Sequence, residues 1–166
     1  MKKSKMLAIA LAASLVLSQV MSQPVMANGE IEPTHISVEA QVSCYEYGEM
    51  YDICPELLMA MIEAESSGNP KAENGDCKGL MQISERWHTG RMAEIGADDI
   101  WSETDNIHIG ANYLHELFNR YEDVALVLMV YNGESDAAEK AEKGYISDYA
   151  RKILDRSAEL ERWKGK

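Results

Sequence analysis

The sequence predicts a compact all-helical domain. Two observations carry this prediction: apolar residues recur at helical spacing over several long segments, and helix-capping residues stand at the ends of those segments. The chain has no internal repeat, and no run of alternating apolar and polar residues is bounded by turn signals. We therefore expect helices packed around one core, with room for a small hairpin or an irregular loop.

The first two helices are predicted between Ser37, where the fold begins, and Pro70. The segment 39–51 forms the first helix. Pro55 starts the second, because the N–H group that proline lacks has no partner at the first helical position. Gly68 and Pro70 end that helix.

The third and fourth helices are each predicted from a capping residue. Ser84 is expected to cap a helix that ends near Gly96. Asp105 is expected to cap a longer helix over residues 106–121. The apolar and small residues that recur at helical spacing in this longer segment are Ile107, Gly110, Ala111, Leu114, Leu117, Phe118 and Tyr121.

Three further helices are predicted in the C-terminal part. Asp123 can cap a short segment, 124–132, that is apolar on all sides and therefore typical of a buried helix; Gly133 ends it. A polar helix follows within residues 134–144. The last helix, within residues 145–163, has one apolar and one charged face and is expected to pack on the rest.

The N-terminal segment has the features of a secretory signal. Residues 1–27 combine lysines, an apolar run of about a dozen residues and an A-x-A-like end. That run is shorter than the roughly 20 residues of a membrane-spanning helix, although an uncleaved anchor remains the alternative. We expect a flexible leader over residues 28–36, one domain over residues 37–166, and a location outside the cell, in the cell wall or in the periplasm.

The charge of the chain excludes some partners. Its formal net charge is −12, and removing residues 1–27 makes the chain about three charges more negative. Such a surface repels nucleic acid and anionic lipid. We therefore expect no nucleic-acid partner, membrane contact only through an uncleaved signal, and a monomer.

The cysteines and histidines predict a disulfide rather than a metal site. Cys44, Cys54 and Cys77 are expected to form one disulfide and leave one free thiol, with all three pairings open. No C-x-x-C or HExxH motif occurs, and the histidines are scattered. We expect neither a metal nor another cofactor.

One acidic residue of the predicted Pro55 helix falls on its apolar side. When successive residues are placed about 100° apart, Glu65 lies within an apolar stripe made of Leu57, Leu58, Met61 and Ile62. Glu56 and Glu63 fall on the opposite side, where we expect them to face solvent.

The spacing alone leaves two interpretations of Glu65 open. In the first, the residue lies in the last helical turn and reaches solvent or a basic partner. In the second, apolar neighbours exclude water from the carboxyl group, which raises its pKa and lets it hold a proton near neutral pH. Such a group can act as a general acid.

Three short motifs favour the second interpretation. Glu65-Ser66 and the following Gly68-Asn69-Pro70 precede GLMQI at residues 79–83 and VYNG at residues 130–133. In this order they resemble the soluble lytic transglycosylase domain family, over about residues 51–154. The resemblance implies a helical fold similar to goose-type lysozyme and cleavage of bacterial cell-wall glycan.

The resemblance also implies roles for individual residues. Glu65 matches the family's catalytic acid and base. The residues that would contact the substrate are Ser66, Met81, Gln82, Tyr131, Asn132 and Tyr149. Met81 and Gln82 are expected to line the cleft, and Tyr149 matches a tyrosine that hydrogen-bonds the acid. The Glu-Thr pair that often precedes this tyrosine is replaced here by Tyr145-Ile146.

The implied reaction cleaves the β-1,4 bond between N-acetylmuramic acid and N-acetylglucosamine of peptidoglycan and forms a 1,6-anhydro product. A lysozyme-like hydrolase, a non-catalytic wall-binding module and a helical interaction protein remain the alternatives. Trp87, Trp101 and Trp163 are candidates for stacking on sugars, and Trp163 is expected at the surface because it is nearly terminal.

Overall fold

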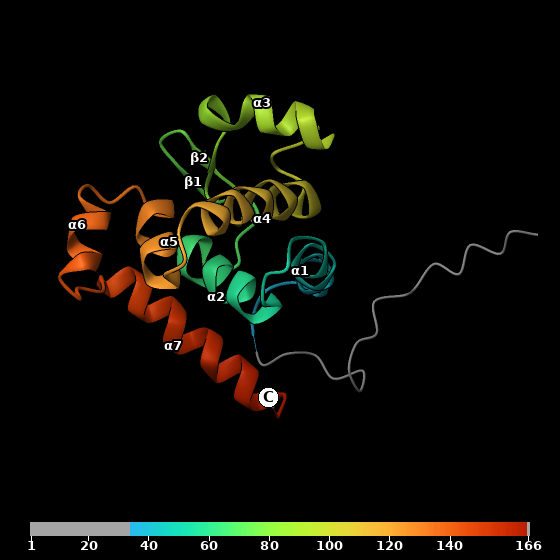
Figure 1. Cartoon of the computed structure of the whole chain (residues 1–166). Coiled ribbons are helices and arrows are strands. Elements are labelled where there is room, and N and C mark those ends of the chain that lie inside the picture. The colour runs from blue at the N-terminus through green and yellow to red at the C-terminus, as the bar shows by residue number, and fades with distance from the viewer. Residues whose placement is uncertain (1–33, 166) are drawn as a thin grey trace, which may run out of the picture.

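The computed structural model describes residues 34–165, which form seven α-helices and a small three-stranded sheet (Figure 1). The all-helical prediction is confirmed, and the expected hairpin lies between the second and third helices. The predicted signal, residues 1–27, lies outside the described residues, as does most of the predicted leader. No helix within residues 34–165 is both long and apolar enough to cross a bilayer.

The order of the elements follows the chain. The helices are α1 Val38–Tyr51, α2 Pro55–Ser66, α3 Glu85–Ile95, α4 Glu103–Arg120, α5 Val124–Tyr131, α6 Ala137–Glu142 and α7 Asp148–Trp163. The strands are β1 Glu73–Asn74, β2 Cys77–Lys78 and β3 Ile83–Ser84. The strands are antiparallel in the order β1-β2-β3, with Asn74 opposite Cys77 and Lys78 opposite Ile83.

The predicted bounds of α3 are confirmed: Ser84 stands at the N-cap position and Gly96 at the C-cap, although the Ser84 hydroxyl donates a hydrogen bond to Asp76 and accepts none from the helix. The predicted cap of α4 is wrong. Helix α4 starts earlier than predicted, because Ser102 accepts the N–H of Asp105 at 3.3 Å. The Asp105 carboxylate instead accepts two backbone N–H groups of the preceding loop, both at 2.9 Å. The predicted cap of α5 is confirmed: Asp123 accepts N–H groups at 2.8 and 3.1 Å.

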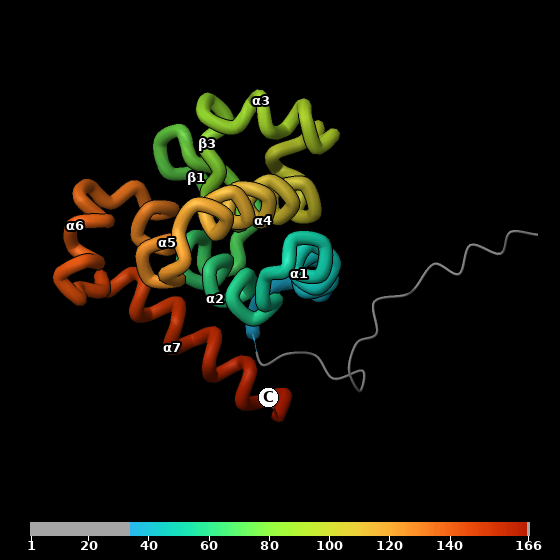
Figure 2. Tube along the Cα trace, viewed as in Figure 1, coloured from blue at the N-terminus to red at the C-terminus, as the bar shows by residue number. Residues whose placement is uncertain are grey.

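Helix α2 lies at the centre of the molecule. Helices α1 and α7 pack against it, and α7 runs along its side in Figure 2. Seven consecutive residues of α2, from Glu56 to Ile62, are buried, so the helix is covered all round. Its last turn, which carries Glu65, is only partly buried.

The prediction that Glu56 and Glu63 face solvent is wrong, because α7 covers that side of α2. Glu56 has no exposed surface, and its carboxylate lies 3.8 Å from the Lys164 ammonium group. Glu63 accepts two hydrogen bonds from the Arg156 guanidinium, at 2.7 and 3.0 Å. These ion pairs connect α2 to the C-terminal half of α7 and its cap.

The predicted disulfide is absent: all three cysteines, which lie within the described residues, are free thiols. Cys44 is buried in α1, Cys54 immediately precedes α2, and Cys77 lies in β2. The cysteine count predicted a disulfide, but the fold distributes the three residues over separate elements.

Asn106 fixes the loop that carries the GLMQ motif. Its side chain accepts the N–H of Met81 at 2.8 Å and donates to the carbonyl groups of Lys78 at 3.0 Å and Ile100 at 2.8 Å. Gly79 has a φ of +76°, and a Cβ atom there would collide with the Asn106 side chain. The buried amide therefore holds three backbone groups and needs a glycine beside it.

We expect Asn106→Ala to lower the free energy of unfolding by about 2–4 kcal/mol, because it leaves buried backbone groups without partners. Urea denaturation of the purified domain measures this change. Asn119→Ala, at an exposed position of the same helix, is the matched control. A loss below about 0.5 kcal/mol for Asn106→Ala, as for an ordinary surface substitution, would contradict the anchoring role.

Candidate active site

Glu65 lies at the C-terminal end of α2, where the helix leaves the core. Its side chain is partly buried, and the hydroxyl of Tyr149 from α7 donates a hydrogen bond to its Oε1 atom. Burial raises the pKa of Glu65, and this effect outweighs the opposing effect of the Tyr149 hydrogen bond, which stabilises the carboxylate. The protonated form of Glu65 is thus favoured relative to an exposed glutamate.

Two tyrosines surround this carboxyl group. The pKa values of Tyr149 and Tyr131 are both raised. Burial is the larger cause, and the negative charge of Glu65 is the second. Both phenols are therefore neutral donors. The Tyr131 hydroxyl donates to the carbonyl oxygen of Met81 at 3.0 Å, which connects the end of α5 to the GLMQ loop.

The GLMQ residues contribute mainly to the shape of the site. The expectation that Met81 lines the cleft is wrong for its side chain, which is fully buried. Gly110 of α4 leaves the space for it, because a Cβ atom there would collide with the Met81 sulfur. Gln82 has a φ of 48°, and its amide donates to the carbonyl groups of Ala72 at 3.3 Å and Gly79 at 3.0 Å.

The remaining predicted residues, Ser66 and Asn132, differ in their surroundings. The Ser66 hydroxyl donates back to the carbonyl of Ile62 at 3.0 Å, within its own helix. The Asn132 side chain is exposed and donates to the Glu134 carboxylate at 3.3 Å. Asn132 therefore presents polar atoms at the surface, whereas Ser66 is engaged with α2.

A groove of about 550 Å³ runs beside Glu65. Its lining residues come from the β2–α3 region, from α4 and from the end of α5, and are Cys77, Gln82, Ile83, Ser84, Trp87, His88, Arg91, Tyr113, Glu116, Arg120, Val130, Tyr131, Asn132 and Gly133. Glu65 itself is not part of the lining. Its charge nevertheless contributes to the raised pKa of both Cys77 and Tyr131, so its carboxyl group is close enough to interact with these two lining residues.

The structure therefore brings together three predicted residues, Gln82, Tyr131 and Asn132, in a single groove. The hydrogen-bonded pair of Glu65 and Tyr149 interacts electrostatically with Tyr131 of this groove. The aromatic rings of Tyr131 and Tyr113 lie 5.4 Å apart and continue the wall along α4.

Sequence reasoning missed the wall that α3 and α4 supply. On α3 the lining residues Trp87, His88 and Arg91 follow helical spacing, and on α4 so do Tyr113, Glu116 and Arg120. This periodicity is a signal that could have grouped them on two facing sides. Of the candidate tryptophans, Trp87 lines the groove and is 73% exposed, whereas Trp101 and Trp163 lie outside it.

A network of polar side chains crosses this wall. Arg91 donates from Nε to His88 Nδ1 at 3.2 Å and from a terminal nitrogen to Glu116 at 2.5 Å. Arg120 donates to the other oxygen of Glu116 at 2.6 Å. The pKa of His88 is lowered to about 4, mainly by burial and secondly by the positive charge of Arg91, so its imidazole is neutral at pH 7. The hydrogen bond from Arg91 lowers the pKa of Glu116, which stays ionised.

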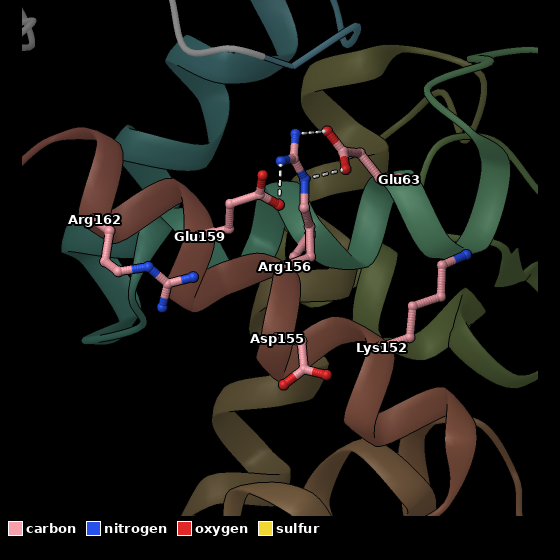
Figure 3. A pocket seen from close by; sticks show the side chains of 7 residues that line it. Glu63, Lys152, Asp155, Arg156, Glu159 and Arg162 are labelled. Carbon is pink, nitrogen blue, oxygen red and sulfur yellow. Dashed lines mark hydrogen bonds and ion pairs between the residues drawn. The ribbon is translucent and has the colours of Figure 1, made fainter.

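A second groove, of about 470 Å³, lies between α2 and α7 (Figure 3). Figure 3 shows Arg156 bridging Glu63 and Glu159. Although burial alone would raise the pKa of Glu63, hydrogen bonds from Arg156 and Thr34 lower it below its usual range. Glu63 and Glu159 are paired with Arg156, and the pKa of Glu63 is lowered rather than raised, so the groove beside Glu65 is the better candidate for acid–base chemistry.

The chain is similar to known proteins over most of its described residues. Residues 43–153 match the model of the family described as "Transglycosylase SLT domain". The chain belongs to this family. The resemblance read from the motifs and the predicted fold class are both confirmed. Within the described residues of this SLT domain, no group of three or more His, Cys, Asp or Glu residues could hold a metal ion.

Two curated relatives are similar to this SLT domain. One is a "Transglycosylase" of Enterobacteria phage PRD1, 34% identical over 89 residues, which cover 53% of this chain and 32% of that protein. The other is "Protein IpgF" of Shigella flexneri, 31% identical over 121 residues, which cover 68% of this chain and 79% of that protein. The chain spans about a third of the phage protein.

The raised pKa of Glu65 has a consequence for stability. Because the folded-state pKa lies above the unfolded one, the wild type loses stability as pH rises through the folded-state value. Glu65→Gln removes this titration. We therefore expect Glu65→Gln to have a higher Tm than the wild type at pH 8, by a few degrees, and a similar Tm at pH 4. Thermal unfolding followed by circular dichroism at both pH values measures the difference.

The matched control is Glu142→Gln, which removes one charge from an exposed position at the end of α6. Its effect on Tm should be small at both pH values. The opposite result would be a Glu65→Gln variant that is less stable than the wild type at pH 8 but equally stable at pH 4. It would show that the fold favours the ionised carboxylate and would contradict the raised pKa.

Proposed function

We propose that this SLT domain is a peptidoglycan lytic transglycosylase that cleaves the β-1,4 bond between N-acetylmuramic acid and N-acetylglucosamine. The observation that carries the proposal is a carboxyl group with a raised pKa, Glu65, which accepts a hydrogen bond from Tyr149 and lies near an open groove. The SLT family match and the similarity to a phage protein named "Transglycosylase" support the same reaction class.

In the proposed reaction Glu65 acts first as an acid and then as a base. It gives its proton to the glycosidic oxygen as the bond from C1 to that oxygen breaks. The resulting carboxylate accepts the hydrogen bond from Tyr149 and takes the proton of the muramyl 6-hydroxyl. The 6-oxygen attacks C1 of the same sugar and forms the 1,6-anhydro ring, which regenerates protonated Glu65.

A reaction with one acid fits the electrostatics of the groove. Most glycosidases use two carboxyl groups, the second as a nucleophile or as a base that activates water. Glu116 is the ionised carboxylate in the groove lining, and both of its oxygens are held by arginines, Oε2 by Arg91 and Oε1 by Arg120. Intramolecular attack by the 6-hydroxyl needs no second carboxylate and benefits from a high effective concentration.

The groove residues would bind the glycan. Gln82, Tyr131 and Asn132 would present amide and hydroxyl groups to the N-acetyl and hydroxyl groups of the sugars, and the exposed indole of Trp87 would stack on a sugar ring. Ser66 would support the acid from its own helical turn. In this proposal the enzyme is a monomer that meets peptidoglycan outside the cytoplasm after removal of residues 1–27.

The test is digestion of purified peptidoglycan, followed by mass spectrometry of the released fragments. We expect 1,6-anhydro ends, which are one water lighter than reducing ends. Glu65→Gln keeps the shape of the side chain but cannot donate and recover a proton, so we expect its rate to fall at least about a hundredfold. Its fold, measured by circular dichroism, should be retained.

The same experiment separates the alternatives. Fragments with reducing ends alone would show a lysozyme-like hydrolase that uses the same acid with water. Wild-type turnover in Glu65→Gln would remove Glu65 from the mechanism. Absence of cleavage by the wild type, with glycan binding retained, would instead indicate a wall-binding module. Exposed Glu142→Gln serves again as the control for the loss of one negative charge.

A further inference from the structure

The end of the Glu65 groove that α3 and α4 form carries positive charge in an acidic protein. The chain as a whole has a formal net charge of −12. The ionised groups in the groove lining are nevertheless two guanidinium groups, Arg91 and Arg120, and a single carboxylate, Glu116. His88 is neutral at pH 7, because its pKa is lowered to about 4. This end of the groove, which we call the distal end, therefore attracts anions locally.

Arg91 already has a full set of partners. It donates to His88, Asn112 and Glu116, its side chain is 16% exposed, and its guanidinium lies 5.1 Å from the centre of the Tyr113 ring. A new ligand would have to displace one of these contacts. Arg91 thus positions Glu116 and is not itself the group that would bind an anion.

Arg120 differs from Arg91 in its exposure and in its contacts. It is the last residue of α4, and its side chain is 58% exposed. Among residues 34–165, Glu116 is the group that its guanidinium contacts, through one terminal nitrogen at 2.6 Å. The other guanidinium nitrogens remain available to a ligand. Glu116, held from the other side by Arg91, fixes the direction of this guanidinium.

We propose that Arg120 forms a distal subsite that recognises a carboxylate carried by a substituent of the glycan strand, as in the peptide stems of peptidoglycan. This inference rests on the proposed function, which places the glycan in the groove. Arginine suits the role because its planar guanidinium can pair with both oxygens of a carboxylate.

The distal subsite would lie well away from the bond that is cleaved. Arg120 comes seven residues after Tyr113 on α4, a separation of about 10 Å along the helix axis. Tyr113 in turn contacts Tyr131, which lies beside Glu65. The subsite would therefore select the substrate through a side branch of the strand, and its loss would raise KM without changing the chemical step.

Electrostatics give the subsite a second purpose. A chain with a net charge of −12 repels carboxylates on average. The Arg120 guanidinium offsets that repulsion at the position of the carboxylate-bearing substituent. It therefore favours one position of the glycan strand in the groove. Because Arg120 is exposed, we expect the preference to weaken as the salt concentration rises.

The experiment compares two substrates: glycan strands with intact peptide stems, and the same strands after carbodiimide and ammonia have converted the stem carboxylates to neutral amides. We expect the wild type to have a lower KM for the strands with free carboxylates. Arg120→Gln should raise that KM roughly two- to fivefold. It should leave the KM for the amidated strands and both kcat values unchanged. Arg120→Lys, which keeps the charge, should retain part of the preference.

Arg162→Gln is the matched control, because Arg162 also lies in the last turn of a helix, α7, but lines the other groove. It should keep the full preference. Equal wild-type KM values for the two substrates, or an Arg120→Gln variant that raises both alike, would overturn the distal subsite and leave the proposed function standing. Failure of the wild type to cleave either substrate would overturn both.

Discussion

The carboxyl group of Glu65 experiences two opposing effects, and the properties of the site depend on their balance. Removal from water favours the protonated acid, while the hydroxyl of Tyr149 donates a hydrogen bond that favours the carboxylate. Burial is the larger effect. An acid that must first lose a proton and then regain it needs both effects. Burial keeps the proton on Glu65 before the reaction, and the hydrogen bond from Tyr149 stabilises the anion once the proton has left.

The fold sets this balance through α2 and α7. Helix α2 is buried along most of its length but emerges from the core in its last turn, which leaves Glu65 between the interior and the groove. Helix α7 supplies Tyr149 at one end and, further along, the partners of Glu63 and Glu56. Helix α7 and its cap thus provide cations to Glu56 and Glu63, whereas no cation among residues 34–165 forms an ion pair with Glu65. Asn106 of α4 completes the arrangement by holding the GLMQ loop.

The helical periodicity of the sequence predicted the helices well and singled out Glu65, because that residue interrupts an apolar stripe. The same helical projection of α2 failed for Glu56 and Glu63. It assumes one solvent-exposed face, and it contains no information on α7, which covers that face. The predicted cap at Asp105 failed, and Ser84 occupies its predicted cap position without a capping bond, because nearby loops compete for the same side chains. The groove wall that contains Arg91, Glu116 and Arg120 forms where α3 packs beside α4. The spacing of residues within one helix does not predict which other helix packs beside it.

Carbon-13 NMR of the Glu65 carboxyl carbon, followed through a pH titration of the wild-type domain without substrate, measures this balance between burial and the Tyr149 hydrogen bond. We expect a pKa above the usual range of an exposed glutamate, and a resonance that is absent from the Glu65→Gln spectrum. A pKa within or below that usual range would mean that Tyr149 and solvent outweigh burial, that Glu65 is already ionised at neutral pH, and that it is not the acid of this site.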